Sequence, residues 1–243
     1  KYPYETLEKF CLTRDTIEDH PMQVLDDLSA GLRSPVLPIK VKNDNGDEIA
    51  CRSRFSFVYS DEGKVQAVFY PALKTAPLEK FGAEEQKSLM AGKTIVSDVN
   101  LPDGLSTRAY IQIDPETRQV ITAPASLIEN NLKLASDAFH LAQQEVTSIK
   151  NGKPLTFSIG NDPITIGVDL TDKKGIRICE GDDIEWKNQS KKEWGKYTFG
   201  CYGCWITDSD GNHDYISEED YTEELWDEQK KAGQRNISSG LRK

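Results

Sequence analysis

Two cysteines in an aromatic segment are the closest pair of residues that could do metal or redox chemistry: Cys201-Tyr-Gly-Cys204. Two thiolates at this spacing can occupy one edge of a zinc site or form a redox pair. A structural zinc needs two more ligands, and only His213 and Cys179 are plausible, at non-standard spacings. A redox pair usually opens a helix, whereas residues 199–205 predict a strand. Two ordinary thiols are therefore favoured, with zinc and redox chemistry as alternatives, and no metal site or cofactor is predicted.

An acidic segment, residues 208–214, resembles a calcium-binding loop in composition. Its glycine, Gly211, comes too early for the helix-loop-helix calcium motif, and the segment lies between two predicted strands. A hairpin turn is therefore favoured. The Gly-Lys pairs at 92–93 and 152–153 lack the rest of a phosphate-loop motif, and we expect each pair to end a helix.

Aromatic and basic residues alternate between positions 186 and 205. Such a pattern can stack single-stranded bases, can bind a protein, or can form a core with lysines on the solvent side. A core is the favoured interpretation. The histidines His20, His140 and His213 are scattered with no nucleophile beside them, so no catalytic residues are predicted. The residues taken as a candidate binding site are Lys187, Lys191, Lys192, Trp194, Lys196 and Tyr197.

Composition limits the function classes. The chain has 243 residues and a formal net charge of −10, and residues 200–232 hold ten acidic but only two basic residues. A strongly anionic chain does not attract phosphate backbones through its general field. No apolar run approaches the ~18 residues of a spanning helix, so no membrane association is predicted. The five cysteines, an odd and sparse set, favour a reducing compartment, and we expect a cytoplasmic protein.

Two segments of the chain are related in sequence: residues 84–95 read EEQKSLMAGKTI and residues 144–155 read QEVTSIKNGKPL. Aligning Gly92 with Gly152 places Glu85 over Glu145, and further along Asp114 falls over Asp169. Each unit predicts a short helix that ends at glycine, then three strands with a polar turn before the third. Residues 22–70 follow the same plan more loosely.

These patterns predict an α+β protein, mainly antiparallel β with short helices, built from two or three related helix-strand-strand-strand units. We expect Ser217 to cap the last helix, with Leu225 and Trp226 as its packing residues. The predicted organisation is an N-terminal α+β domain (1–135, with repeat units 1–75 and 76–122), a second α+β domain with a C-terminal acidic helix (136–235), and a frayed tail (236–243).

The order of motifs resembles a family of bacterial domains of unknown function. The motifs are a helix reading TLEKFCLTRD (6–15), the strand SPVLPI (34–39), an arginine-bearing strand (52–57), the hairpin DEGK (61–64), a helix before glycine (81–92) and the strand IQID (111–114). Cys11 stands where that family usually has glycine.

A companion domain of unknown function usually follows the first, and residues 141–168 are similar to it. The resemblance covers roughly residues 5–180 and leaves the segment 186–235 unmatched. It implies an origin on conjugative or integrated mobile elements of gut bacteria, beside DNA-processing genes. It also implies that this chain is part of a longer protein, and it implies no catalytic residues.

The resulting hypothesis is a non-enzymatic interaction or accessory module of a mobile genetic element. It would bind a protein partner or assist DNA processing. One alternative is an acidic anti-defence protein that imitates nucleic acid through residues 208–228. The other is direct nucleic-acid binding through residues 187–196. The sequence leaves the oligomeric state open.

Overall fold

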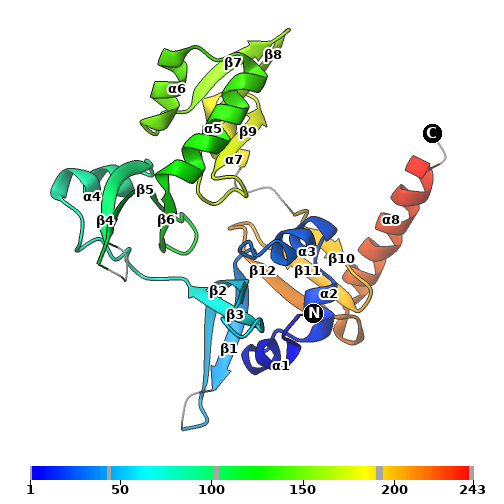
Figure 1. The fold of residues 1–243 in the computed structure, drawn as a ribbon. Coiled ribbons are helices and arrows are strands. Elements are labelled where there is room, and N and C mark those ends of the chain that lie inside the picture. The colour runs from blue at the N-terminus through cyan, green and yellow to red at the C-terminus, as the bar shows by residue number, and fades with distance from the viewer. Residues whose placement is uncertain (1, 43–44, 101–103, 190–193, 241–243) are drawn as a thin grey trace. The chain divides into compact units, whose positions relative to one another are not determined.

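The chain alternates short helices with small antiparallel sheets (Figure 1). The computed structural model describes residues 2–42, 45–100, 104–189 and 194–240. The elements are α1 (Tyr4–Leu7), α2 (Arg14–Glu18), α3 (Met22–Ser29), β1 (Leu37–Lys42), β2 (Glu48–Tyr59), β3 (Val65–Pro71), α4 (Ala83–Met90), β4 (Ile95–Asn100), β5 (Ser106–Ile113), β6 (Val120–Pro124), α5 (Ala125–Phe139), α6 (Gln143–Lys150), β7 (Leu155–Ile159), β8 (Asp162–Val168), β9 (Ile176–Glu180), α7 (Asp183–Gln189), β10 (Tyr197–Phe199), β11 (Gly203–Thr207), β12 (His213–Ser217) and α8 (Glu223–Gly240), with 3-10 helices at Glu8–Phe10 (η1) and Glu218–Asp220 (η2).

The predicted α+β fold with repeated helix and strand units is confirmed. Within the described ranges the strands form four three-stranded sheets, each in sequential order: β1-β2-β3, β4-β5-β6, β7-β8-β9 and β10-β11-β12. The pairings are antiparallel. Over the same residues, none of the helices combines the length and the apolar character that a membrane span requires.

The sheets are grouped into two compact units. Unit 1 joins Lys1–Tyr70 with Glu193–Lys243, and unit 2 is Pro71–Lys192. This grouping by contacts is separate from the predicted sequence domains 1–135 and 136–235, which stay a prediction. Helix α5 spans the predicted boundary between them. The predicted frayed tail, 236–243, overlaps the end of α8 and continues into 241–243, outside the described residues.

The aligned residues of the sequence repeat have the same structural roles. Glu85 and Glu145 each accept a hydrogen bond from the backbone N–H that precedes their helix, at 3.0 and 2.7 Å. Gly92 and Gly152 each end the helix with a positive φ, +74° and +77°. A left-handed residue just after a helix lets the last carbonyls find donors, and glycine adopts that conformation without strain. Gly31 ends α3 in the same way.

The turns between the second and third strands of the four described sheets differ in length but are closed by the same two contacts. The residue after the middle strand pairs its backbone N–H with a carbonyl across the turn, and its side-chain oxygen accepts a backbone N–H from within the turn. Aspartate and serine suit this position because their short side chains reach the backbone two to four residues ahead. The four residues are Ser60, Asp114, Asp169 and Asp208.

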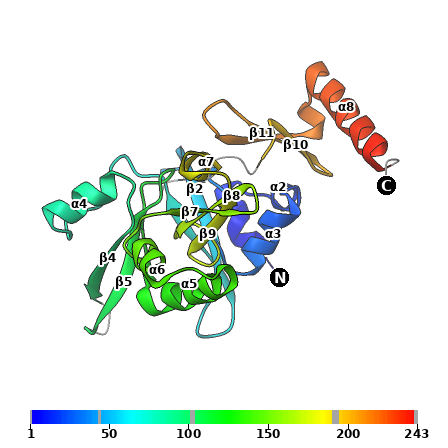
Figure 2. The same cartoon turned by 90° about the horizontal axis from the view of Figure 1, so that it is seen from above.

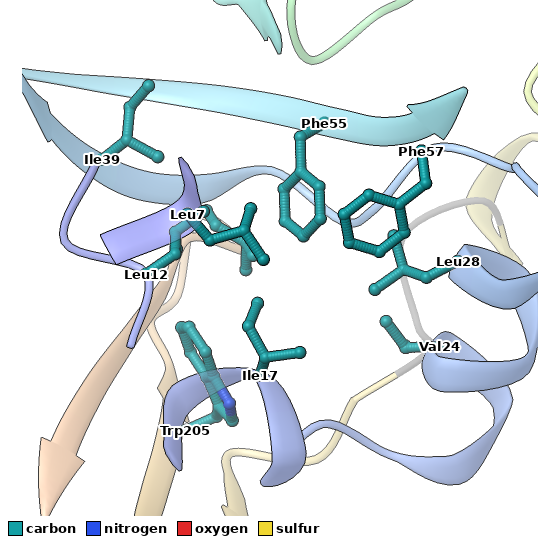
Figure 3. Close-up of a cluster of buried hydrophobic side chains, with 10 residues drawn as sticks. Leu7, Leu12, Ile17, Val24, Leu28, Ile39, Phe55, Phe57 and Trp205 are labelled. Carbon is teal, nitrogen blue, oxygen red and sulfur yellow. The ribbon is translucent and has the colours of Figure 1, made fainter. Parts of the chain in front are cut away.

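Unit 1 has a core to which both ends of the sequence contribute. Figure 3 shows Phe55 and Phe57 directed from β2 toward side chains of the N-terminal helices, with Trp205 close to Ile17. Trp205 comes from β11 and is 1% exposed. Since the side chains of α1 to α3 cover one face of the β1-β2-β3 sheet, Trp205 fills a gap that those helices leave.

Unit 2 has its main core around α5. Ile128 and Leu132 pack with Tyr110 of β5 and with Ile166 of β8, so two sheets share one core. The amide of Gln112 in β5 strengthens this link, because its oxygen accepts the backbone N–H of Leu170 at 2.8 Å.

A matched pair of glycine variants tests the packing of unit 2. A Cβ on Gly92 would meet nothing within 4 Å, whereas a Cβ on Gly152 would overlap the carbonyl oxygen of Thr94. We expect Gly92→Ala to lower the free energy of unfolding by about 1–2 kcal/mol, the cost of a left-handed alanine. Gly152→Ala should cost a further ~1–3 kcal/mol from overpacking. Urea unfolding of both variants measures this, and equal losses would contradict the close approach of Gly152 to Thr94.

Candidate binding surface of the C-terminal sheet

A buried carboxylate attaches the C-terminal sheet to the N-terminal helices. Asp19 follows α2 and is 4% exposed. It accepts hydrogen bonds from the backbone N–H groups of Cys201 (2.6 Å) and Tyr202 (3.0 Å) and from the hydroxyl of Tyr215 (2.7 Å). A Cβ on Gly200 would collide with the Asp19 carboxylate, so glycine is needed there for the close approach. Three donors stabilise a buried charge that would otherwise be costly.

An aromatic cluster lies beside Asp19. The His20 ring centroid is 4.8 Å from that of Trp205 and 5.5 Å from that of Trp194. Trp194 also stacks on His213 at 4.1 Å. The Nδ1 atom of His20 lies 3.1 Å from the carbonyl oxygen of Ile17 and donates to it, because a carbonyl only accepts. This contact leaves Nε2 as the unprotonated acceptor, buried among the two indoles.

Burial changes the titration of this cluster. Desolvation lowers the pKa of His20 to about 4. Desolvation, followed by the charge of Arg52, lowers the pKa of His213 to about 4 as well. Both imidazoles are therefore neutral at pH 7. Desolvation also raises the pKa of the Cys204 thiol to about 11, so this cysteine is a protonated, unreactive thiol at neutral pH.

A row of aromatic side chains leads from the sheet to α8; it consists of Tyr197, Phe199, Tyr221 and Trp226 and is called the aromatic row below. Neighbouring ring centroids along it are 6.1, 6.2 and 5.1 Å apart. The Tyr197 hydroxyl donates to Glu224 of α8 at 3.1 Å. Trp226, at the end of the row, is 39% exposed.

Helix α8 begins differently from the prediction. Ser217 precedes η2 and makes no side-chain cap, and the hydroxyl of Thr222 accepts the Leu225 N–H at 3.4 Å instead. Leu225 is buried as expected, but Trp226 is not a core residue. In Figures 1 and 2, α8 starts beside the sheet β10-β11-β12 and extends away from it.

The residues proposed from sequence as a binding site fall in different places. Trp194, Lys196 and Tyr197 belong to unit 1, and Lys187 lies on α7 in unit 2, paired with Asp183 at 3.2 Å. Lys191 and Lys192 lie outside the described residues. The Lys196 ammonium lies 4.8 Å from the Tyr197 ring centroid. The Tyr197 hydroxyl, and then Glu224 and Glu228, raise the pKa of Lys196.

The structure also shows where the candidate metal ligands and the candidate calcium loop of the sequence analysis lie. Cys201 is exposed in the turn before β11, whereas Cys204 is buried on that strand. In the part of the chain that the structure describes, no three His, Cys, Asp or Glu side chains come together to hold a metal ion. Asp208 forms the predicted hairpin turn, in which its carboxylate accepts the N–H groups of Asp210 and Asn212 at 2.9 and 2.8 Å.

Sequence reasoning missed Asp19 and Tyr215. They lie 196 positions apart and share a hydrogen bond, so no local spacing connects them. Tyr221 was missed as well, because the prediction placed it inside the last helix, whereas in the structure it lies between η2 and α8. A contact of this kind can be inferred only after the C-terminal sheet is placed on the N-terminal helices.

Comparisons with known proteins cover residues 1–80, which include the first segment of unit 1 and the beginning of unit 2. Residues 1–80 match a family described as "Protein of unknown function (DUF4099)". No curated protein matches the chain, and no solved structure does. The matched residues include α1 to β3, which supports the resemblance to a domain of unknown function. The C-terminal sheet, which completes the core of unit 1, lies outside the match.

Removing the Asp19 carboxylate should loosen the C-terminal sheet. We expect Asp19→Ala to lower the free energy of unfolding by about 3 kcal/mol, since it leaves two backbone N–H groups and one hydroxyl without their acceptor. Tyr215→Phe, which removes one donor and keeps the ring, should cost about 1–2 kcal/mol. Chemical unfolding followed by tryptophan fluorescence measures both values. A loss no larger for Asp19→Ala than for Tyr215→Phe would contradict the central role of the carboxylate.

The neutral histidines predict acid sensitivity. The unfolded chain binds protons at His20 below its ordinary pKa of 6.5, and the folded chain binds them only near pH 4. Stability should therefore fall as the pH falls from about 6.5 to about 4, by up to about 3 kcal/mol for one such group. His20→Gln should remove this part of the pH dependence. The measurement is the free energy of unfolding of both proteins at several pH values, and parallel curves would contradict the prediction.

Proposed function

We propose that the chain is a non-enzymatic interaction module that binds a protein partner through the aromatic row at the start of α8. The row ends at the partly exposed Trp226, and the exposed acidic residues Glu223, Glu224 and Asp227 lie within three positions of it on α8. Tyrosine and tryptophan are enriched at interface centres and at the positions that contribute most binding energy. This surface is the single observation on which the proposal depends.

The groups that could do chemistry near this surface already have structural roles. Asp19 accepts three donors, and Cys204 is buried with a raised pKa. His20 donates to a backbone carbonyl and is enclosed by tryptophan rings. These engagements favour a binding module over an enzyme. The placement on a mobile genetic element, as an accessory to DNA processing, comes from the resemblance that covers roughly residues 5–180.

Charge favours a protein partner over nucleic acid at this surface. Lys196 has Glu224 and Glu228 near it. The other described lysine of the predicted site, Lys187, belongs to unit 2, where it is paired with Asp183. A nucleic-acid site needs cations that are available to phosphates. The acids of α8 are likewise partly compensated, because Asp227 pairs with Lys230 and Glu228 with Lys231. Imitation of nucleic acid by this segment is therefore a weaker alternative.

The partner can be sought by affinity capture from the lysate of the host, with and without nuclease. We expect Trp226→Ala to remove the partner, since loss of a central tryptophan typically costs about 2 kcal/mol, or about thirtyfold in affinity. Tyr59→Ala is the matched control, because Tyr59 is an aromatic side chain of the same unit, 79% exposed, at the end of β2. Circular dichroism of each variant checks that it is folded.

Three outcomes would contradict the proposal. Equal capture by the wild type and Trp226→Ala would exclude the aromatic row. Loss of all captured proteins after nuclease, with binding that falls steeply with salt, would favour the nucleic-acid alternative. Loss of the partner only when Glu223, Glu224, Asp227 and Glu228 are together changed to amides would favour acidic imitation of nucleic acid.

A further inference from the structure

The outer face of the β1-β2-β3 sheet carries a polar group of side chains that the proposed function does not use. Figure 3 shows Phe55 and Phe57 on the core side of β2. Because side chains alternate along a strand, Arg54 and Ser56 point to the opposite face. Ser56 is nevertheless only 2% exposed. Something therefore covers it on that side of the sheet.

Arg33 and Tyr70 provide the cover. The segment before β1 runs beside β2, since Ser34 N–H donates to the Phe55 carbonyl at 2.7 Å. The Arg33 guanidinium carbon lies 3.8 Å from the centroid of the Tyr70 ring. The Tyr70 hydroxyl in turn lies 3.1 Å from the Ser56 hydroxyl. A stacked arginine, two hydroxyls and a sheet surface thus meet in one place.

The stacked guanidinium has an unused donor. Among the described residues, the Nη1 atom of Arg33 is buried and has no hydrogen-bond partner. A buried cationic donor without an acceptor is unfavourable, and such groups in native proteins usually have a water or an ion. The contact with the Tyr70 ring holds the guanidinium in place, and its unpaired Nη1 group can donate to an anionic partner there.

A second guanidinium lies on the same face. The Nη1 atom of Arg54 donates to the carbonyl of Ser34, the residue after Arg33, at 2.9 Å. This bond orients Arg54 along the segment that carries Arg33. Arg52, two positions before Arg54, pairs with Asp214 at 3.2 Å.

We propose that Arg33, with the hydroxyl of Tyr70 beside it, forms a binding site for a phosphate group. Phosphate matches the planar fork of arginine and has a third oxygen for the Tyr70 hydroxyl, whereas one carboxylate offers only two oxygens. The phosphate could be a free ion, or it could belong to a nucleic-acid backbone. This site is separate from the aromatic row, so the two proposals can fail independently.

The test is an NMR titration of the full chain that observes the arginine Nε–Hε signals. The probes are inorganic phosphate, a short single-stranded DNA without terminal phosphate, and sodium acetate. We expect phosphate or DNA to shift the Arg33 signal in a saturable way and acetate to do so much more weakly. Arg33→Gln should lower the affinity about tenfold or more, because a hydrogen bond to a charged group is lost.

Two further variants complete the test. Arg33→Lys keeps the charge but loses the fork, so it should bind more weakly than the wild type and more tightly than Arg33→Gln. Arg14→Gln removes an exposed arginine of α2, paired with Glu18, and should bind as the wild type does. Shifts by both phosphate and DNA identify phosphate itself as the ligand, and shifts by DNA alone identify the backbone of a nucleic acid.

The proposal is overturned if neither phosphate nor DNA moves the Arg33 signal of the wild type. This outcome does not depend on the folding of any variant. It is also overturned if acetate binds as tightly as phosphate, or if Arg14→Gln loses as much affinity as Arg33→Gln.

Discussion

The hydrogen bonds to Asp19 are the interaction on which unit 1 depends. Each small sheet has an apolar face that must be buried, and it does so against helices or against another sheet. Asp19 holds the turn before β11 against the end of α2, and this contact lets Trp205 enter the core formed by the N-terminal helices. The aromatic row, which extends from the same sheet, is positioned through the same contact.

Unit 2 also has a buried carboxylate at the contact between its sheets: Asp169 is 4% exposed and pairs with Arg177 at 2.8 Å. Its two sheets share α5, and the amide of Gln112 bonds to the turn after β8. In both units the repeated piece is a short stretch of sequence that forms a helix ending at glycine and three strands, with a turn closed by serine or aspartate. How the pieces are joined differs between the units: Asp19 and the turn before β11 join them in unit 1, whereas α5 and Gln112 join them in unit 2.

This division explains what could be predicted from sequence. The roles of Glu85, Gly92 and Asp114, and of their counterparts in the second repeat, depend on neighbours within six residues and follow from helix and turn chemistry. The Asp19 contacts join residues more than 180 positions apart, so no local pattern contains them. The prediction that Trp226 packs in the core was wrong. The last helix begins at Glu223 and buries Leu225, but it leaves the Trp226 indole partly exposed.

The two proposed sites of unit 1 have different origins in the sequence. Arg33, Ser56 and Tyr70 lie inside the segment 1–80 that matches a family, whereas Tyr197, Tyr221 and Trp226 lie outside it. A phosphate site built only from the matched segment can accompany that segment into other proteins. The aromatic row needs the C-terminal sheet, which Asp19 attaches. If both proposals hold, phosphate recognition is a property of the matched segment, and the choice of protein partner is a property of the sheet added to it.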